Sequence, residues 1–263
     1  MSRSRTQTVL IRRHEGGVVR RVPDELIIEE PMEIRLDGHL VTTTMRTPGH
    51  DYELAVGFLA TDGHLGGAPV ESVRYCALGP AVDTAFNVVT VETGGRAPTP
   101  TARLTTTTSS CGLCGSASLD ELLLRLAPVK VGIPFDIDVV AAVAERVDVD
   151  QGLFQATGAV HAAAAFDRTG RPVLVREDVG RHNAVDKVVG RLLLDQALPA
   201  TELGLYVSGR ASFEIVQKAW AAGFGVVVAV SAPTALAVET ARAAGITLVG
   251  FVRGARSNVY APA

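Results

Sequence analysis

The second half of the chain alternates between short apolar runs and longer amphipathic segments, and this pattern restricts the fold more than any other feature. We predict strands at 158–166, 172–177, 203–208, 225–231 and 246–252, and helices at 182–197, 211–222 and 234–244. Such alternation is typical of a layered α/β domain with a largely parallel sheet. The turn residues 167–170 make the first two strands antiparallel neighbours.

The first half of the chain has a β-rich pattern. Asp37-Gly38 separates two β-type runs and predicts a hairpin over 32–44. Asp51 is expected to cap a short helix that ends near Ala60, with strand-like runs at 70–78 and 84–92. A capping box at Ser118 predicts one further helix, and 138–147 fits another.

These patterns divide the chain into three parts. They are an N-terminal arm (1–22), an N-terminal subdomain (23–135) and an α/β subdomain (136–263). The arm is rich in arginine, and no apolar segment of an export signal follows its Arg-Arg pairs, so we expect a solvated and partly disordered segment.

Charge, hydropathy and cysteine content argue against a nucleic-acid-binding, membrane-spanning or disulfide-rich secreted protein. The net charge of −3 gives no basic excess, so we predict no nucleic-acid partner. No apolar run approaches the roughly 20 residues of a membrane helix. Three cysteines in 263 residues do not form a secreted disulfide framework, and we expect a cytoplasmic location.

A stretch rich in Thr, Ser, Gly and Pro (93–110) leads to the motif Cys111-Gly112-Leu113-Cys114, so we predict a mobile thiol loop. The helix that follows favours a thiolate at its N-terminus. Three functions compete for this motif. A structural zinc site would need four ligands, and no second pair lies near, so we predict no metal. A redox dithiol and a sulfur carrier that forms a persulfide both remain open.

Three Gly-Arg elements follow predicted strands, at 180–182, 208–210 and 253–256. Ligands of open α/β sheets bind beyond the carboxyl ends of strands, where helix N-termini and arginine attract phosphate. We therefore infer a site for a phosphorylated ligand. The polar positions of the helix that begins near 182 indicate either the lining of a pocket or an ion-paired, solvated first turn.

The chain resembles the formate dehydrogenase accessory sulfurtransferases, the FdhD family, over nearly its whole length from about residue 23. The run Asp-Val-Gly-Arg-His-Asn-Ala-Val-Asp-Lys at 178–187 is the most specific part of the resemblance. The other matching segments are 57–59, 109–115, 154–163, 208–210, 231–234 and 250–254.

The resemblance implies that a cysteine desulfurase passes sulfur to Cys111 as a persulfide, with Cys114 assisting. The acceptor would be the molybdenum or tungsten bis-molybdopterin guanine dinucleotide cofactor, and its sulfuration would activate formate dehydrogenase. The resemblance also implies a three-layer α/β/α core like that of cytidine deaminases, and a homodimer. Deaminase activity is not expected, because the sequence after His161 lacks the required glutamate.

The sequence therefore predicts a sulfurtransferase with Cys111 and Cys114 as its catalytic residues. The alternatives are a dithiol oxidoreductase and a cofactor chaperone without sulfur chemistry. The residues expected to bind the cofactor are Phe251, Val252, Arg253, Gly254, Ala255, Arg256, Arg181, His182, Asn183, Asp186, Lys187, Ser208, Gly209 and Arg210.

Overall fold

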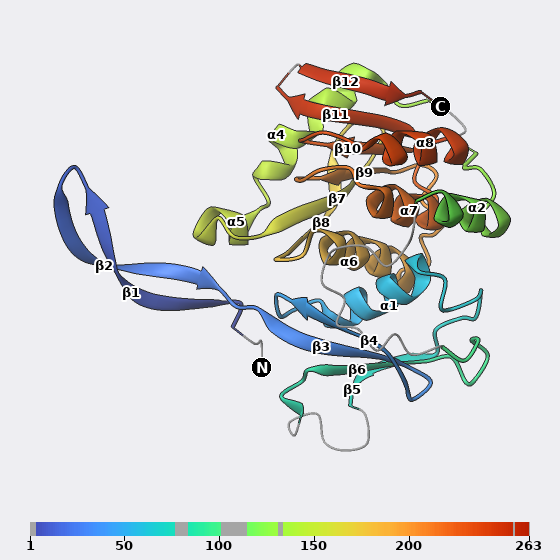
Figure 1. Ribbon diagram of the computed structural model, residues 1–263, viewed down its shortest axis with the longest axis horizontal. Helices are drawn as coiled ribbons and strands as arrows, with labels where there is room; N and C mark the ends of the chain where they lie inside the picture. Colours follow the sequence, from blue (N-terminus) through green and yellow to red (C-terminus); the bar gives the residue numbers. More distant parts are fainter. Residues whose placement is uncertain (1–3, 77–83, 101–114, 131–133, 255, 263) are drawn as a thin grey trace.

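The computed structural model in Figure 1 describes residues 4–76, 84–100, 115–130, 134–254 and 256–262. Its larger sheet has the strand order β12-β11-β10-β9-β7-β8. The strands are β7 (His161–Phe166), β8 (Pro172–Asp178), β9 (Gly204–Val207), β10 (Val226–Ala229), β11 (Thr247–Arg253) and β12 (Arg256–Ala261). All five strands predicted from residue 157 onward are therefore present, together with β12, which was not predicted.

The directions of these strands differ from the largely parallel arrangement that we predicted. Only β9–β10 and β10–β11 pair in parallel, whereas β7 is antiparallel to both of its neighbours and β12 is antiparallel to β11. The antiparallel β7–β8 pair was predicted from the turn at 167–170 and is confirmed. The β11–β12 connection is likewise too short for a parallel crossover. Strands β8, β9, β10 and β11 consequently run in one direction, and β7 and β12 run in the other.

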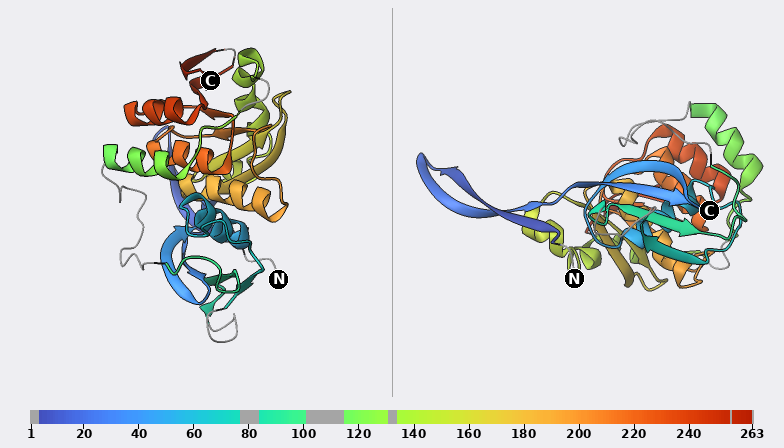
Figure 2. Two further views of the ribbon diagram at one scale, coloured as in Figure 1. Left: turned by 90° about the vertical axis from the view of Figure 1, so that its right-hand side faces the viewer. Right: turned by 90° about the horizontal axis from the view of Figure 1, so that it is seen from below.

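Helices cover both faces of this sheet, which confirms the three-layer prediction (Figures 1 and 2). On one face lie α6 (Arg181–Leu194), α7 (Phe213–Ala222) and α8 (Ala235–Ala244), and on the other α3 (Ile137–Ala141) and α4 (Val143–Asp148). Alternate strand residues serve the two cores, with Leu205 and Val207 facing α6–α8 and Tyr206 facing α4.

The N-terminal subdomain contains a four-stranded sheet of order β4-β3-β6-β5. Strands β3 (Glu30–Leu36) and β4 (His39–Arg46) form the predicted hairpin, and β5 (Ser72–Tyr75) and β6 (Val88–Glu92) complete the sheet. Helix α1 (Asp51–Thr61) packs on its apolar face. Asp51 is not the N-cap as predicted, because His50 occupies that position and the Asp51 carboxylate binds the buried guanidinium of Arg46.

The N-terminal arm forms a two-stranded ribbon, so the expectation of partial disorder is wrong for residues 6–22. Strands β1 (Thr6–Glu15) and β2 (Val18–Ile27) pair antiparallel over their full lengths. Gly16 and Gly17 form the turn between them with positive φ angles. The ribbon projects away from the rest of the molecule (Figures 1 and 2).

Two predicted helices have other boundaries, and one helix was missed. Helix α2 (Gly115–Arg125) begins at Gly115, so Ser118 lies inside the helix and does not cap it. The predicted helix 138–147 is interrupted at Ala142 between α3 and α4, and α5 (Gly152–Thr157) was not predicted. Among the described residues, no helix is both long enough and apolar enough to span a bilayer.

Helices α1 and α6 pack at backbone contact through a pair of glycines, and this contact joins the two subdomains. A Cβ atom on Gly57 would lie 1.8 Å from the carbonyl oxygen of Asp186, and one on Gly190 would lie 1.8 Å from that of Glu53. Any side chain larger than hydrogen would therefore force the helices apart.

Candidate functional site

A pocket of about 650 Å³ opens at the edge of the large sheet where the carboxyl ends of β9, β10 and β11 lie. Its wall on the side of α4 and α5 includes Glu145, Asp148, Gln151 and Phe154. The sheet contributes His161, Tyr206, Ser208, Arg253 and Gly254. This is the edge at which open α/β sheets bind ligands.

Strand direction explains why residues distant in sequence meet here. Strands β8, β9 and β11 run in the same direction, so the Gly-Arg elements that follow them emerge at one edge, as predicted. Strand β7 runs the opposite way, and its first residue, His161, therefore lies at the same edge. Gly158 ends α5 with a φ of 65° and turns the chain toward β7.

At this edge of the sheet, some of the predicted site residues line the pocket, and Arg181 lies outside it at the start of α6. Ser208, Val252, Arg253 and Gly254 line the pocket. Arg181 lies outside that lining, beside His161 and Gly209 at the start of α6. Of the other predicted residues, Arg210, Phe251 and Arg256 are exposed, and Ala255 lies outside the described residues.

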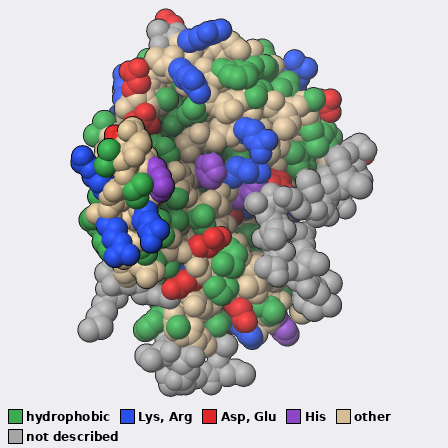
Figure 3. Space-filling view, turned by 60° about the vertical axis from the view of Figure 1, so that its left-hand side comes forward, with side chains coloured by type: hydrophobic (Ala, Val, Ile, Leu, Met, Phe, Trp, Pro, Cys, Tyr) green, Lys and Arg blue, Asp and Glu red, His purple; other side chains and the backbone are tan. Residues whose placement is uncertain are grey.

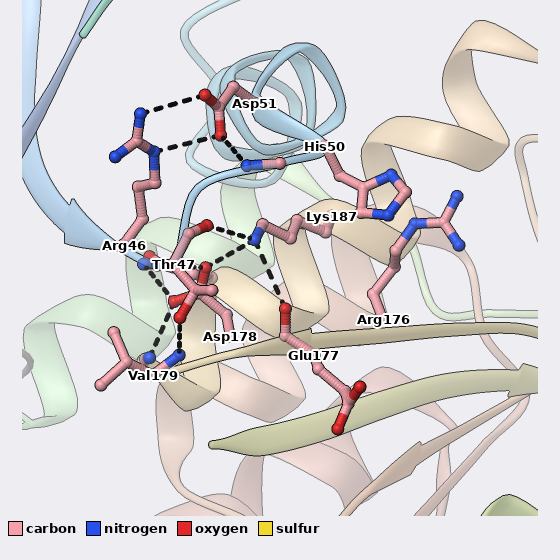
Figure 4. Close-up of polar contacts among 12 residues, drawn as sticks. Arg46, Thr47, His50, Asp51, Arg176, Glu177, Asp178, Val179 and Lys187 are labelled. Atoms are coloured by element: carbon pink, nitrogen blue, oxygen red, sulfur yellow. Dashed lines mark hydrogen bonds and ion pairs between the residues drawn. The ribbon is translucent and has the colours of Figure 1, made fainter. Parts of the chain in front are cut away.

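Three predicted pocket residues of α6, namely Asn183, Asp186 and Lys187, are buried in the joint between the subdomains, and Figure 4 shows the contacts of Lys187. The Nζ atom of Lys187 lies 2.7 Å from Asp178 Oδ2 and donates to the Thr47 carbonyl at 3.0 Å. Both charged side chains are fully buried. The pair therefore stabilises the joint only as a unit, since either charge alone would be costly to bury.

Asp186 and Asn183, the other two predicted pocket residues of α6, also make polar contacts with the N-terminal subdomain. Asp186 accepts hydrogen bonds from Lys218 Nζ and Thr61 Oγ1, both at 2.9 Å. Asn183 donates to the Met45 carbonyl at 2.8 Å. The polar face of α6 thus neither lines the pocket nor forms a solvated turn; it binds the helix to the N-terminal subdomain.

Glu53 and Arg176 form another ion pair in this joint, with Arg176 Nε 2.5 Å from Glu53 Oε2. Burial by itself would raise the pKa of Glu53, but the hydrogen bonds and charge of Arg176, with help from His50, lower it to about 2. Because the folded-state pKa lies below the ordinary value of 4.5, the pair stabilises the fold above that value. This stabilisation is lost as the pH falls toward the folded pKa.

Glu53→Gln is therefore expected to remove part of the acid sensitivity of the fold. Urea unfolding between pH 7 and pH 3 should give a smaller loss of free energy in the variant than in the wild type. Glu15→Gln, in the exposed ribbon, is the control and should retain the wild-type pH dependence. Equal pH slopes in Glu53→Gln and the wild type would contradict the assignment.

Sequence reasoning missed several residues that build the pocket. Glu177 accepts hydrogen bonds from the backbone N–H groups of Leu153 and Phe154 at 2.9 and 2.8 Å, which holds α5 and its half-exposed Phe154 at the pocket. His161 was noted only for the missing deaminase glutamate. Both Phe154 and His161 belong to the segment 154–163, which matches the family. That match was the signal in the sequence that could have indicated a site here.

The described part of the site combines an arginine, hydrogen-bonding groups and an aromatic side chain with the carboxylates of Glu145 and Asp148. Arg253 can bind phosphate through its guanidinium, Ser208 and His161 offer hydrogen-bonding groups, and Phe154 offers an aromatic surface. The predicted catalytic residues Cys111 and Cys114 lie outside the described residues. Cys76 is described, and it is a half-buried free thiol.

Fold and pocket together define a three-layer α/β protein with a pocket at the carboxyl edge of a mixed sheet. The model of the FdhD/NarQ family matches residues 27–263. The sulfur carrier protein FdhD of Streptomyces avermitilis is 47% identical over 274 residues, covering 99% of this chain and 95% of that protein. The protein of the same name from Nocardia farcinica is 48% identical over 262 residues, covering 97% and 92%.

A solved structure agrees with the fold. A Desulfotalea psychrophila protein described as a formate dehydrogenase accessory protein matches with a TM-score of 0.76 and 24% identity, over 98% of this chain and 97% of that one. The chain belongs to the FdhD/NarQ family.

Proposed function

We propose that this protein is a sulfur carrier that supplies sulfur for the activation of a formate dehydrogenase. The similarity to relatives named sulfur carrier protein, across almost the full length of both chains, carries this proposal. The two-cysteine motif at 111–114 supplies the thiol that such a function needs. Cys111 is the sulfur-bearing residue.

The donor in this proposal is a cysteine desulfurase that carries a persulfide. The Cys111 thiolate attacks the outer sulfur of that persulfide, so an S–S bond forms on Cys111 and the desulfurase cysteine leaves as a thiolate. Cys114 can then attack the Cys111 sulfur, which releases hydrosulfide and leaves a Cys111–Cys114 disulfide. An external dithiol must reduce that disulfide before the next cycle.

The acceptor in this proposal is the bis-molybdopterin guanine dinucleotide cofactor of the client enzyme, in its molybdenum or tungsten form. The pocket supports this acceptor, because it joins an arginine, hydroxyl and imidazole groups, and an aromatic surface. Arg253 would hold a phosphate, and Phe154 would contact the base. A cytoplasmic location and a homodimer complete the proposal.

Mass spectrometry of the cysteine peptides tests the sulfur-carrying step. After incubation with cysteine and a cysteine desulfurase, the Cys111 peptide should gain the mass of one sulfur atom, and dithiothreitol should remove it. Cys111→Ala should show no gain on the same peptide. A wild-type protein whose Cys111 never gains sulfur would refute the proposal.

Calorimetry with GDP tests the acceptor pocket. Arg253→Ala is expected to weaken GDP binding about tenfold, because a charge-assisted Arg–phosphate contact is lost. Arg74→Ala, which removes an exposed arginine from the N-terminal sheet, should bind like the wild type. Undetectable GDP binding in the wild type, or equal affinities in all three proteins, would exclude the pocket as the nucleotide site.

A further inference from the structure

Arg181 lies where three elements meet, just outside the pocket. A Cβ atom on Gly209 would lie 4.0 Å from Arg181 Cδ and 3.6 Å from His161 Nδ1, so the start of α6, the segment after β9 and the start of β7 meet here. The Nε atom of Arg181 is buried and has no hydrogen-bond partner among the described residues. A buried donor without a partner is costly unless something supplies an acceptor.

Two helix N-termini point to the kind of acceptor. Neither α6 nor α7 has a side-chain hydrogen bond at its N-cap, Gly180 or Ser212. The two starts are adjacent, because His182 Nε2 lies 2.7 Å from Glu214 Oε2 and 3.5 Å from Ser212 Oγ. Uncapped first-turn N–H groups and the helix dipoles both favour an anion.

Among the described residues, no carboxylate forms a salt bridge with Arg181, although the charge of Arg181 contributes to lowering the pKa of Glu214. The nearby carboxylates are already paired, Asp178 with the buried Lys187 and Glu214 with His182. Burial, followed by the charges of Arg181 and His182, lowers the pKa of His161, while Asp178 opposes the shift. An anion that offsets the charge of Arg181 would therefore favour protonation of His161.

Figure 3 shows the molecule with the left-hand side of Figure 1 turned toward the viewer. Near the centre of this view, His side chains lie together with Lys and Arg side chains. The pocket that contains Arg253 lies toward α4, whereas Arg181 begins a helix of the opposite layer. His161 lines the pocket and also neighbours Arg181, so it lies between the two places.

We propose that Arg181, His161 and the starts of α6 and α7 form a second anion subsite, separate from the Arg253 pocket, for a tetrahedral oxyanion of the phosphate class. Identifying its natural ligand as a further phosphate of the cofactor acceptor rests on the proposed function. A phosphate-bearing acceptor would then be held at two points, one on each side of the sheet edge.

Sulfate is a suitable probe, because it remains a dianion across the pH range in which histidine titrates. In NMR titrations of the full chain, sulfate should shift the imidazole signals of His161 and His182 in a saturable manner. These signals are identified by their loss in His161→Gln and His182→Gln. Arg181→Gln should weaken sulfate binding at least about tenfold, and Arg181→Lys less, because lysine keeps the charge but loses the guanidinium fork.

Arg191→Gln is the matched control, since it removes an exposed arginine from the last turn of the same helix. It should bind sulfate like the wild type. The proposal is overturned if the wild type shows no saturable shift, or if Arg181→Gln binds as tightly as Arg191→Gln. The dispersion of the NMR spectrum shows in the same samples whether each variant is folded.

Two further measurements, the pH dependence of sulfate binding and competition with GDP, test the role of His161 and the separation of the subsite from the pocket. Sulfate affinity should fall several-fold from pH 6 to pH 8, because binding is coupled to proton uptake by His161; a pH-independent affinity would exclude His161. Saturating GDP should leave sulfate binding intact. If GDP abolishes the sulfate shifts, the phosphates of the nucleotide occupy this position and the separate subsite is refuted. The persulfide measurement on Cys111 is unaffected by either result.

Discussion

Replacing Cys111 by alanine is expected to abolish activation of the client formate dehydrogenase, because no other residue would then form the persulfide. The client enzyme is produced in a host whose own gene for the sulfur carrier has been deleted and which expresses one variant of this protein at a time. The measured quantity is the rate of formate oxidation by the client enzyme. Cys76→Ala is the control and should retain wild-type activation. Cys76 contributes its carbonyl oxygen to a hydrogen bond from Thr90 Oγ1, and that bond survives the substitution.

The same assay separates the alternative functions. A dithiol oxidoreductase requires both thiols but carries no sulfur, so Cys111→Ala and Cys114→Ala would be equally inactive and Cys111 of the wild type would gain no sulfur. A chaperone that only binds the cofactor would keep full function in Cys111→Ala. Sulfur carriage predicts complete loss in Cys111→Ala together with a sulfur-loaded Cys111 in the wild type.

Gly57→Ala is expected to destabilise the protein by about 3 kcal/mol, at the upper end of the usual cost of overpacking. The new methyl group would overlap the carbonyl oxygen of Asp186, which belongs to the backbone of α6 and cannot move like a flexible side chain. The two helices would have to separate, which would strain the hydrogen bonds from Lys187 Nζ to the Thr47 carbonyl and from Thr61 Oγ1 to Asp186. Urea denaturation followed by circular dichroism measures the change in free energy of unfolding.

Gly152→Ala is the matched control for this prediction. A Cβ atom at Gly152 would meet nothing within 4 Å, and this glycine begins a helix. Alanine there should leave the stability unchanged or raise it slightly, because alanine is the better helix former. A free energy of unfolding for Gly57→Ala within about 0.5 kcal/mol of the wild type would mean that the helices separate at little cost.

The secondary structure of the second half could be predicted because its signals are local. Each core strand contributes a run of small apolar residues, and a turn or helix cap borders most of them. The turn at 167–170 correctly predicted the antiparallel β7–β8 pair. The order of the strands depends on pairing between distant segments, so the antiparallel pairing of β7 with β9 and the position of β12 escaped prediction. Strand β12 consists mostly of exposed or partly buried residues, with only Ala261 buried, and its apolar signal is correspondingly weak.

The candidate site was predictable only in part, for a related reason. Glycine and arginine after strands of one direction indicate a common edge, and the structure places all three elements there. The side of the sheet on which each side chain lies depends on packing between distant segments, and local sequence does not specify that. The polar residues of α6 show the same limit, because pocket lining and buried ion pairs use the same residue types.

The long ribbon of β1 and β2 implies that the molecule has two levels of stability. Its hydrogen bonds connect only two strands, and side chains such as Leu10, Val18 and Val19 are more than half exposed. A two-stranded ribbon is at best marginally stable by itself. Amide protons at its tip should therefore exchange with deuterium through local opening, far faster than those of β9 and β10, which exchange only when the whole core unfolds.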